Sequence, residues 1–371
     1  MKFTSTKDNL SYATQIVQKS VSSKTTIPIL SGILIETGQQ MVKLAATDLE
    51  IGTECSFPAD VQLEGKTVVP ARYFIEFVRR LPDQEITIES NSENSQITIK
   101  YGISEFTLST MDPTEFPILP LSQDGPRFTL TQGKFKQMIK QVLIATSNEQ
   151  VRPVFTGVLL LFEEGTIKLV ATDTHRLAVR EERQEYPLEL EQQIKQVIIP
   201  ARTLSELNRI LLDDNESFSV TITENQILFT TEQIALLSRL IDGHFPNYKQ
   251  VLPKQYSSTI KLKTKELLST LERAALLMSP TEGISSAKFE LQKDKLIVSS
   301  TVPNGSIYEE LPIILEGDPL LIAFNSKYLI DVLRIIDNEE ILFQFTGPLS
   351  SAVIRPTSDE NYFYLVLPIR I

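Results

Sequence analysis

The stretch PVFTGVLLLFEEGTIKLVATDTHRLAVR, at residues 153–180, has a counterpart earlier in the chain. Residues 28–55 read PILSGILIETGQQMVKLAATDLEIGTEC, and both stretches carry P-x-x-x-G followed by A-T-D. Gly32 and Gly157 are separated by 125 positions, and so are Asp48 and Asp173. Self-similarity at a fixed spacing predicts that the chain is built from repeated structural units.

A second element, with the pattern basic-x3-acidic-x2-Arg, occurs three times. Its copies are Arg72, Glu76 and Arg79; Arg202, Glu206 and Arg209; and Lys327, Asp331 and Arg334. The apolar residues between them have helical spacing, which predicts three short amphipathic helices with a core stripe on one face. The predicted stripes are Tyr73, Phe74, Phe77 and Val78; Leu204, Leu207 and Leu211; and Tyr328, Leu329, Val332 and Leu333.

Domain boundaries follow from two proline-rich linkers. At 371 residues the chain is too long for one ordinary hydrophobic core. Residues 115–120 (EFPILP) and 244–253 (HFPNYKQVLP) each lead through a short polar stretch to a new strand and helix. We therefore expect three domains, at residues 1–122, 127–250 and 251–371, of which the third lacks A-T-D.

The fold class is predicted to be α+β. Helices are expected at 7–20, 71–80, 132–146, 201–211, 263–277 and 327–336, two in each domain. Most other segments alternate apolar and polar residues, as in QITIKY, FTLST, VTITENQILFTT and KFELQKDKLIVSS. This pattern is typical of antiparallel sheets. Because each helix precedes a run of strands, every domain is expected to be a doubled half-unit.

Charge is distributed unevenly along this acidic chain, whose net charge is −11. The six predicted helices hold 15 Lys or Arg against 6 Asp or Glu, a net of +9, so the rest carries −20. Any one basic helix could be a solvated face with pairs such as Arg72–Glu76. Six together favour a shared surface for the phosphates of a polyanion. Aromatic residues do not interleave the basic faces, which favours duplex over single-stranded nucleic acid.

An enzyme is disfavoured. Asp173 and His175 are two apart, so on a strand both side chains would point the same way, but no nucleophile or metal motif accompanies them. With one cysteine and two histidines, no metal site and no cofactor is expected. Asp48 and Asp173 are better explained as equivalent turn-fixing carboxylates. No signal peptide or membrane-length apolar run is found, so a soluble cytoplasmic protein is expected.

Several motifs together resemble the bacterial DNA sliding clamps, the beta subunit of DNA polymerase III. They are MKFT at 1–4, KTTIPILSG from Lys24, ATD at 46–48, VPAR at 69–72, ATDTHRLA at 171–178, IDGHFPNY at 241–248 and the terminal LPIR. The resemblance spans the chain and implies a homodimeric ring of six clamp domains, of which one chain forms half. Closure is then head-to-tail, with Phe106, Leu276 and Leu277 at the dimer contact. For Leu276 and Leu277, a plain core role is the competing interpretation.

The resemblance also implies a groove that binds partner peptides between the second and third domains. Its residues would be Phe155, Thr172, His175, Arg176, Leu177, Pro246, Val251, Leu365, Leu367, Pro368, Ile369 and Arg370. Thr174 stands where many relatives have Gly and Ile369 where some have Met, so groove shape is expected to differ. Deleting residues 365–371 is expected to abolish polymerase binding and leave the dimer intact. Taken alone, LVLPIRI would be an ordinary terminal strand.

By the same resemblance, Lys24, Arg72, Arg152 and Arg202 contact DNA, whereas Glu149 next to Asn148 would repel a phosphate. The expected partners are double-stranded DNA, a second copy of the chain, the polymerase catalytic subunit, the clamp loader and other polymerases and repair proteins, in a nucleoid-associated location. Two other functions stay open. One is a DNA-repair nuclease that holds its substrate on the basic face, and the other is a repeat-built interaction platform with no DNA role.

Reversing the charge of Arg72 together with Arg202 is expected to weaken loading on DNA or retention there. Each reversal alone is expected to do little, because the phosphate contacts are many and individually weak. Retention of the protein on DNA measures this. A large loss from one single change would instead indicate a specific site.

Overall fold

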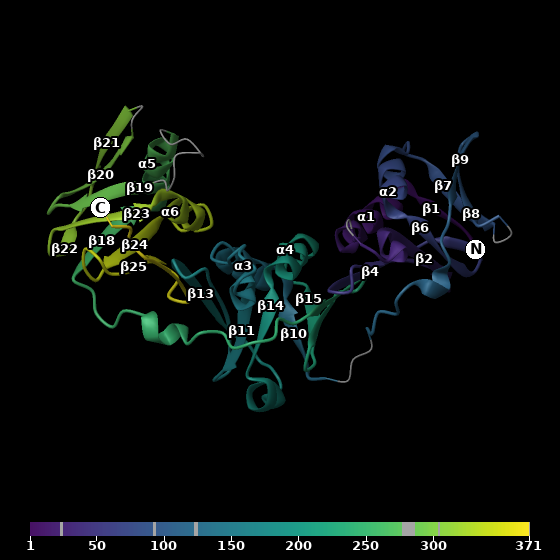
Figure 1. The fold of residues 1–371 in the computed structure, drawn as a ribbon, viewed down its shortest axis with the longest axis horizontal. Helices are drawn as coiled ribbons and strands as arrows, with labels where there is room; N and C mark the ends of the chain where they lie inside the picture. Colours follow the sequence, from purple (N-terminus) through teal and green to yellow (C-terminus); the bar gives the residue numbers. More distant parts are fainter. Residues whose placement is uncertain (23–24, 92–93, 122–124, 277–285, 303–304, 371) are drawn as a thin grey trace. The chain divides into compact units, whose positions relative to one another are not determined.

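The computed structural model describes residues 1–22, 25–91, 94–121, 125–276, 286–302 and 305–370. In this part of the chain one pattern occurs six times, a strand followed by a helix and then three strands (Figure 1). We call each copy a half-unit. The doubled domains expected from the sequence therefore have a direct counterpart in the order of the elements.

The half-units are formed by the following elements. The first two are β1 (Lys2–Thr6), α1 (Lys7–Val17), β2 (Gly32–Gly38), β3 (Met41–Thr47) and β4 (Ile51–Pro58), then β6 (Gly65–Pro70), α2 (Ala71–Arg80), β7 (Glu85–Asn91), β8 (Gln96–Tyr101) and β9 (Ser104–Ser109). The third and fourth are β10 (Arg127–Thr131), α3 (Gln132–Leu143), β11 (Gly157–Glu163), β12 (Thr166–Thr172) and β13 (Arg176–Arg183), then β14 (Gln196–Pro200), α4 (Ala201–Ile210), β15 (Ser217–Ile222), β16 (Gln226–Thr230) and β17 (Ile234–Arg239). The fifth and sixth are β18 (Ser258–Lys263), α5 (Thr264–Leu276), β19 (Ser286–Leu291), β20 (Lys295–Val302) and β21 (Gly305–Pro312), then β23 (Leu320–Asn325), α6 (Ser326–Leu333), β24 (Glu340–Phe345), β25 (Ala352–Pro356) and β26 (Tyr362–Val366). Two short strands, β5 (Asp60–Leu63) and β22 (Leu315–Gly317), lie outside the pattern.

All six predicted helices are present, and each begins within one residue of its predicted start. The hydroxyl of Thr6 caps α1 by accepting from the backbone N–H of Asn9, and the side chain of Asn325 caps α6 in the same way. Such caps satisfy backbone donors that a first turn leaves unpaired. The ends are less regular, because α1, α3 and α6 each stop three residues before the predicted positions.

Contacts divide the chain into two compact units. The first unit comprises residues 1–133 and 206–240, and the second comprises 134–205 and 241–371. These units cut across the sequence repeats because sheets are shared between repeats. In the first unit β17 pairs antiparallel with β4, and in the second unit β26 pairs antiparallel with β13.

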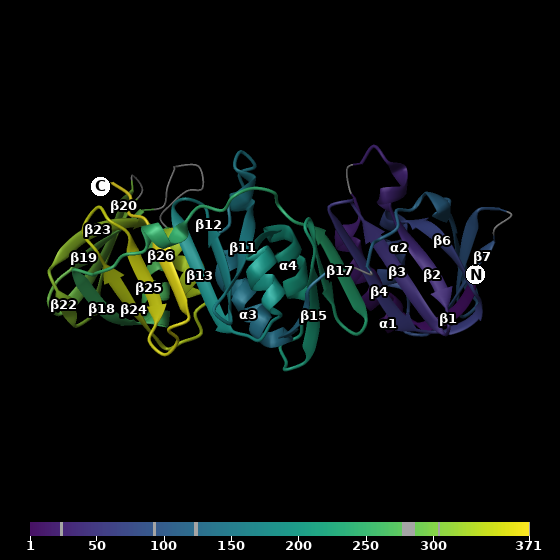
Figure 2. The same ribbon diagram turned by 90° about the horizontal axis from the view of Figure 1, so that it is seen from below.

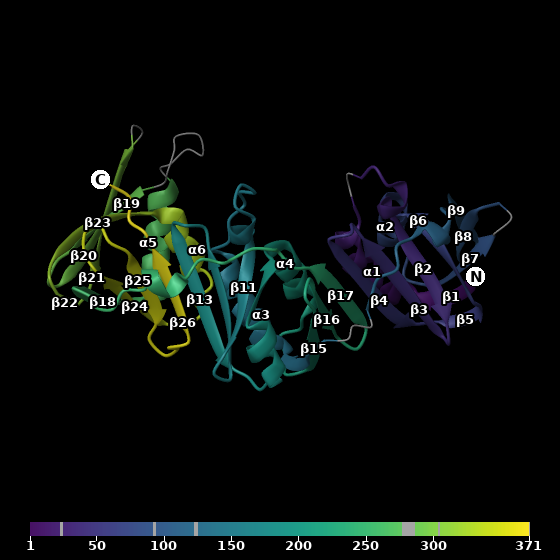
Figure 3. The same cartoon turned by 60° about the horizontal axis from the view of Figure 1, so that its bottom comes forward.

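The first unit contains two antiparallel sheets. One has the order β5-β1-β7-β8-β9 and the other β10-β15-β16-β17-β4-β3-β2-β6 (Figure 3). Helices α1 and α2 pack against one another. Cys55, the single cysteine, is buried on β4, where burial raises the pKa of its thiol to about 12.

The second unit also contains two antiparallel sheets. The larger has the order β14-β11-β12-β13-β26-β25-β24-β18-β22, and its central strands lie side by side in Figure 2. The smaller has the order β21-β20-β19-β23. Phe289, Phe324, Phe343 and Phe345 are fully buried and pack ring against ring, with centroids 4.5–6.4 Å apart. Removing one such ring typically costs about 3–5 kcal/mol.

Two details of the predicted helix faces are wrong. Tyr73 is 59% exposed and so is not part of the core stripe, although Phe74 and Val78 are buried as predicted. Glu76 pairs with Arg79, at 2.8 Å, and with Arg80, instead of with Arg72. Among the residues described, no helix is both long enough and apolar enough to cross a membrane.

Candidate functional site

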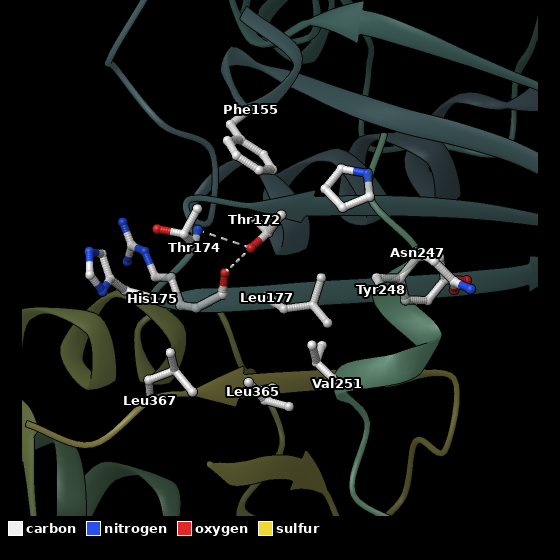
Figure 4. A pocket seen from close by; sticks show the side chains of 12 residues that line it. Phe155, Thr172, Thr174, His175, Leu177, Asn247, Tyr248, Val251, Leu365 and Leu367 are labelled. Carbon is white, nitrogen blue, oxygen red and sulfur yellow. Dashed lines mark hydrogen bonds between the residues drawn. The ribbon is translucent and has the colours of Figure 1, made fainter. Parts of the chain in front are cut away.

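A cavity of about 220 Å³ opens in the second unit (Figure 4). Its floor is apolar, because Leu177 on β13 and Leu365 on β26 are neighbours in the sheet register. The 3-10 turn Tyr248–Val251 closes one side. The lining residues are Phe155, Thr172, Thr174, His175, Arg176, Leu177, Pro246, Asn247, Tyr248, Val251, Leu365 and Leu367. Apolar walls with a few polar groups are typical of ligand-binding cavities.

Nine of the twelve groove residues expected from the resemblance line this cavity. Pro368, Ile369 and Arg370 do not. The backbone of Ile369 instead donates to the carbonyl of Ala323, at 2.8 Å. Asn247 and Tyr248 were missed, although the motif IDGHFPNY that carried the resemblance ends on both. β26 ends at Val366, so interpreting residues 365–371 as an ordinary strand is wrong for residues 367–370, while Ile371 lies outside the described residues.

The turn between β12 and β13 shapes one rim of the cavity. Oδ1 of Asp173 accepts from the backbone N–H groups of His175 and Arg176, each at 3.0 Å. Asp48 makes the same two bonds 125 positions earlier, to Glu50 and Ile51. The prediction that these two carboxylates fix equivalent turns is therefore confirmed.

Thr174 occupies a strained backbone position in this turn. Its φ is +77°, and φ at the equivalent Leu49 is +75°. A β-branched residue rarely adopts a positive φ, whereas Gly does so without strain. This gives a physical reason why Gly suits position 174.

The Asp173 and His175 side chains do not form an acid–base pair. Both residues lie in the turn and not on a strand, so the expectation that they point the same way is wrong. Oδ2 of Asp173 accepts from Nε of Arg176 at 2.9 Å, and Oδ1 is occupied by the turn. No group of three His, Cys, Asp or Glu side chains suited to a metal ion is found among the described residues.

Arg176 is the buried cation of the site. Its Nη1 donates to Asp331 on α6 at 2.8 Å and to the hydroxyl of Tyr364 at 3.4 Å. Its guanidinium also lies 4.4 Å from the centre of the Tyr328 ring. Burial lowers the pKa of Arg176, but Tyr364, Asp331 and Asp173 outweigh that effect, so its pKa is raised and it stays charged.

The first unit contains a smaller version of the same cavity, of about 130 Å³. Thr47, Leu49, Glu50, Ile51 and Gly52 line it, each 125 positions before a residue that lines the larger cavity. Leu237 on β17 pairs with Gly52 as Leu365 pairs with Leu177. The backbone N–H of Arg239 donates to Glu50, and that of Leu367 donates to the equivalent His175. A Cβ on Gly52 would lie 2.6 Å from Cδ2 of Leu119, so the linker fills the space that corresponds to the Leu177 side chain. The smaller volume follows from this filling.

The basic residues named for DNA contact are exposed where the structure describes them. Arg72 lies on α2, Arg202 on α4, and Arg152 just before the 3-10 turn Pro153–Thr156. Lys24 lies outside the described residues. On α3, Phe135 and Ile139 are buried while Lys134 and Lys140 are exposed, as the predicted stripe requires.

Of the residues named for a dimer contact, Phe106 and Leu276 lie on the surface of their respective units. Phe106 on β9 is partly exposed and stacks on Phe77, with centroids 3.9 Å apart. Leu276 is 83% exposed at the end of α5, so the competing core role for it is wrong. Leu277 lies outside the described residues. A large exposed apolar side chain with no core role is suited to an interface.

Comparison with known proteins gives the family. Models of the DNA polymerase III beta subunit match in three parts, the N-terminal domain at 1–120, the central domain at 129–247 and the C-terminal domain at 249–370. The beta sliding clamps of Staphylococcus epidermidis and Staphylococcus aureus are each 35% identical over 380 aligned residues, covering 100% of this chain and 99% of theirs.

Solved structures agree with this match. The DNA polymerase sliding clamp of Bacillus subtilis is similar with a TM-score of 0.94 and 34% identity, covering 100% of this chain and 99% of that one. The sliding clamp of Pseudomonas aeruginosa bound to griselimycin is similar with a TM-score of 0.93 and 30% identity, covering 100% of both chains. The chain belongs to the DNA polymerase III beta subunit family, whose bacterial members are the beta sliding clamps.

Replacing Thr174 by Gly is expected to stabilise the protein. Relief of the positive φ is worth about 1–2 kcal/mol, and the added backbone entropy of Gly costs about 0.5–1 kcal/mol. The midpoint of urea unfolding should therefore rise slightly. Leu49→Gly, at the equivalent turn, should act in the same direction. A fall in the midpoint for Thr174→Gly would contradict the strain assigned to this turn.

Proposed function

We propose that this chain acts as a processivity factor in DNA replication. Two copies close into a ring around duplex DNA and tether the replicative polymerase, and the protein itself catalyses no reaction. The family supports this function, since the relatives described above are beta sliding clamps. The three matched segments support three clamp domains, at residues 1–122, 127–250 and 251–371.

The proposed closure of the ring is supported by how the last strands of the half-units pair with one another. β4 and β17 are the last strands of the first and fourth half-units, and they pair. β13 and β26 are the last strands of the third and sixth, and they also pair. The last strands of the second and fifth, β9 and β21, each lie at a sheet edge in the described chain. Exposed edges are templates for a further strand.

These two edges can satisfy each other between copies. β9 of one copy would pair with β21 of the other, repeating the arrangement found twice within the chain. Two such contacts close a head-to-tail dimer and leave neither β9 nor β21 unpaired. Phe106 lies on β9 itself, and Leu276 ends α5, which precedes β19, β20 and β21 in the fifth half-unit, and both observations support such a contact.

Duplex DNA is the ligand proposed for the basic helices. The six predicted helix segments carry +9 in a chain of −11, and Arg72, Arg152 and Arg202 are exposed. Contacts to phosphates alone read no sequence, which suits sliding. No metal or cofactor is required. We place the protein in the cytoplasm, associated with the nucleoid, and infer that the clamp loader and other polymerases are further partners.

The 220 Å³ cavity is proposed as the partner groove. A short apolar peptide segment would cover Leu177 and Leu365, and the rim of Thr172, His175 and Arg176 would orient it. No observation favours the nuclease alternative, since both oxygens of Asp173 are engaged by the turn and Arg176.

Removing residues 367–371 is expected to abolish polymerase binding and leave the dimer intact. Leu365 and Val366 belong to β26, so a deletion from 365 would also damage the central sheet. Leu367 lines the cavity, and its backbone donates to the carbonyl of His175. The affinity for the polymerase catalytic subunit and the solution mass check this. Unchanged affinity in a truncated protein of unchanged mass would refute the groove.

The mass in solution is expected to be about twice 41.8 kDa. Leu276→Lys should shift it towards the monomer, because burying an exposed leucine is worth roughly 1.5–3 kcal/mol at each contact. Leu63→Lys is the matched control, since Leu63 is exposed on β5 at the opposite edge of the sheet that ends in β9. A monomeric wild type, or a control that dissociates equally, would contradict the proposed closure.

A further inference from the structure

The third copy of the helix motif uses its acidic residue differently from the first two. In α2, Glu76 pairs with Arg79 of its own helix, and in α4, Glu206 pairs with Arg209. In α6, Asp331 pairs with Arg176 at 2.8 Å, while Arg334 pairs with Glu272 on α5 at 2.7 Å. The motif is the same, but in this copy it ties the helix to the groove.

The contacts of Arg176 fall into two groups. Asp173 belongs to the same turn as Arg176 and can hold only the near end of the side chain, through Nε. The far end is held from α6, by Asp331 on Nη1 and by the ring of Tyr328. The hydroxyl of Tyr364 accepts from Nη1 of Arg176 and donates to the carbonyl of Tyr328, so it also links Arg176 to α6.

This arrangement is well suited to preorganisation. Arg176 is only 8% exposed, and the side chains of Asp173 and Asp331 are 13% and 24% exposed, so water screens the ion pairs weakly. A planar guanidinium held at both ends has few rotamers left. A partner that binds against it therefore loses little further side-chain entropy.

The ring of His175 is coupled to the same helix. It stacks near that of Tyr328, with centroids 6.4 Å apart and planes 21° apart. Two polar side chains of the rim, His175 and Arg176, thus contact residues in the first two turns of α6. α6 is consequently the support of the groove wall, although in the described chain neither Tyr328 nor Asp331 lines the cavity.

We propose that Asp331 is a positioning residue of the partner groove, acting through Arg176 from outside the cavity. It holds the guanidinium in the orientation that partner segments meet. This inference rests on the proposed function of the groove. It assigns the acidic residue of the third helix motif to partner binding, whereas the basic residues of that motif belong to the helix surface.

Asp331→Asn tests the proposal, because it keeps the size of the side chain and removes the ion pair. The probe is the replicative polymerase catalytic subunit of the same organism, with its dissociation constant measured on the full-length dimer. The expected loss of affinity is roughly tenfold. Asp331→Glu, which keeps the charge, should retain most of the affinity. Asp337→Asn is the matched control, since Asp337 is exposed just beyond α6.

A double-mutant cycle separates positioning from a general structural effect. If Asp331 acts through Arg176, adding Asp331→Asn to Arg176→Ala should weaken binding no further than Arg176→Ala alone. The proposal would be overturned if the two losses of affinity multiply in the double mutant, or if Asp331→Asn alone leaves the affinity unchanged. If Asp331→Asn fails to fold, Tyr364→Phe replaces it in the cycle. Tyr364→Phe should lower the affinity for the polymerase subunit about threefold, again only when Arg176 is present.

The truncation that lacks residues 367–371 shows whether a negative result concerns the groove as a whole or only the role of Asp331. If that truncation leaves the affinity unchanged, the groove itself is wrongly placed. If the truncation weakens binding while Asp331→Asn does not, the groove stands and only the role of Asp331 is lost.

Discussion

Hydrogen bonding along the edges of strands is the constraint on which the rest of this structure depends. Each half-unit ends in a strand whose outer backbone N–H and C=O groups need partners. An unpaired edge costs free energy when it is buried, and it pairs with other chains when it is exposed. Within the chain this need is met twice, by β4 with β17 and by β13 with β26. Sheets consequently run across the sequence repeats, and contacts define two units where the repeats indicate three domains. The proposed ring meets the same need once more, between copies.

Charge is separated along the chain, because the predicted helix segments are net positive while the rest is strongly acidic. A chain of net charge −11 would be repelled by DNA if its charge were spread evenly. A net charge of +9 on the six predicted helix segments gives this acidic chain basic segments that can contact phosphates, while the rest keeps the protein soluble. Binding through many weak phosphate contacts has no sequence preference, and it falls steeply as salt increases. This is the physical requirement for a protein that must move along DNA.

Local features of the fold could be predicted from the sequence, and long-range ones could not. Helical spacing located α2 to the residue, and the 125-residue separation identified Asp48 and Asp173 as equivalent turns. Periodicity could not reveal that Tyr73 is exposed, because core and surface aromatics share the same spacing. The filling of the smaller cavity by Leu119 and the engagement of Arg176 by Asp331 join residues 67 and 155 positions apart. Resemblance named most groove residues but not Asn247 or Tyr248, which depend on the turn that the linker adopts.

Encirclement of DNA is the central claim, and topology tests it most directly. The protein should be loaded onto nicked circular DNA at a salt concentration high enough to suppress simple electrostatic binding, and its release measured before and after the circle is cut once. A closed ring predicts stable retention on the circle and rapid loss from the free ends after cutting. Equal rates of release from circular and linear DNA would contradict the account.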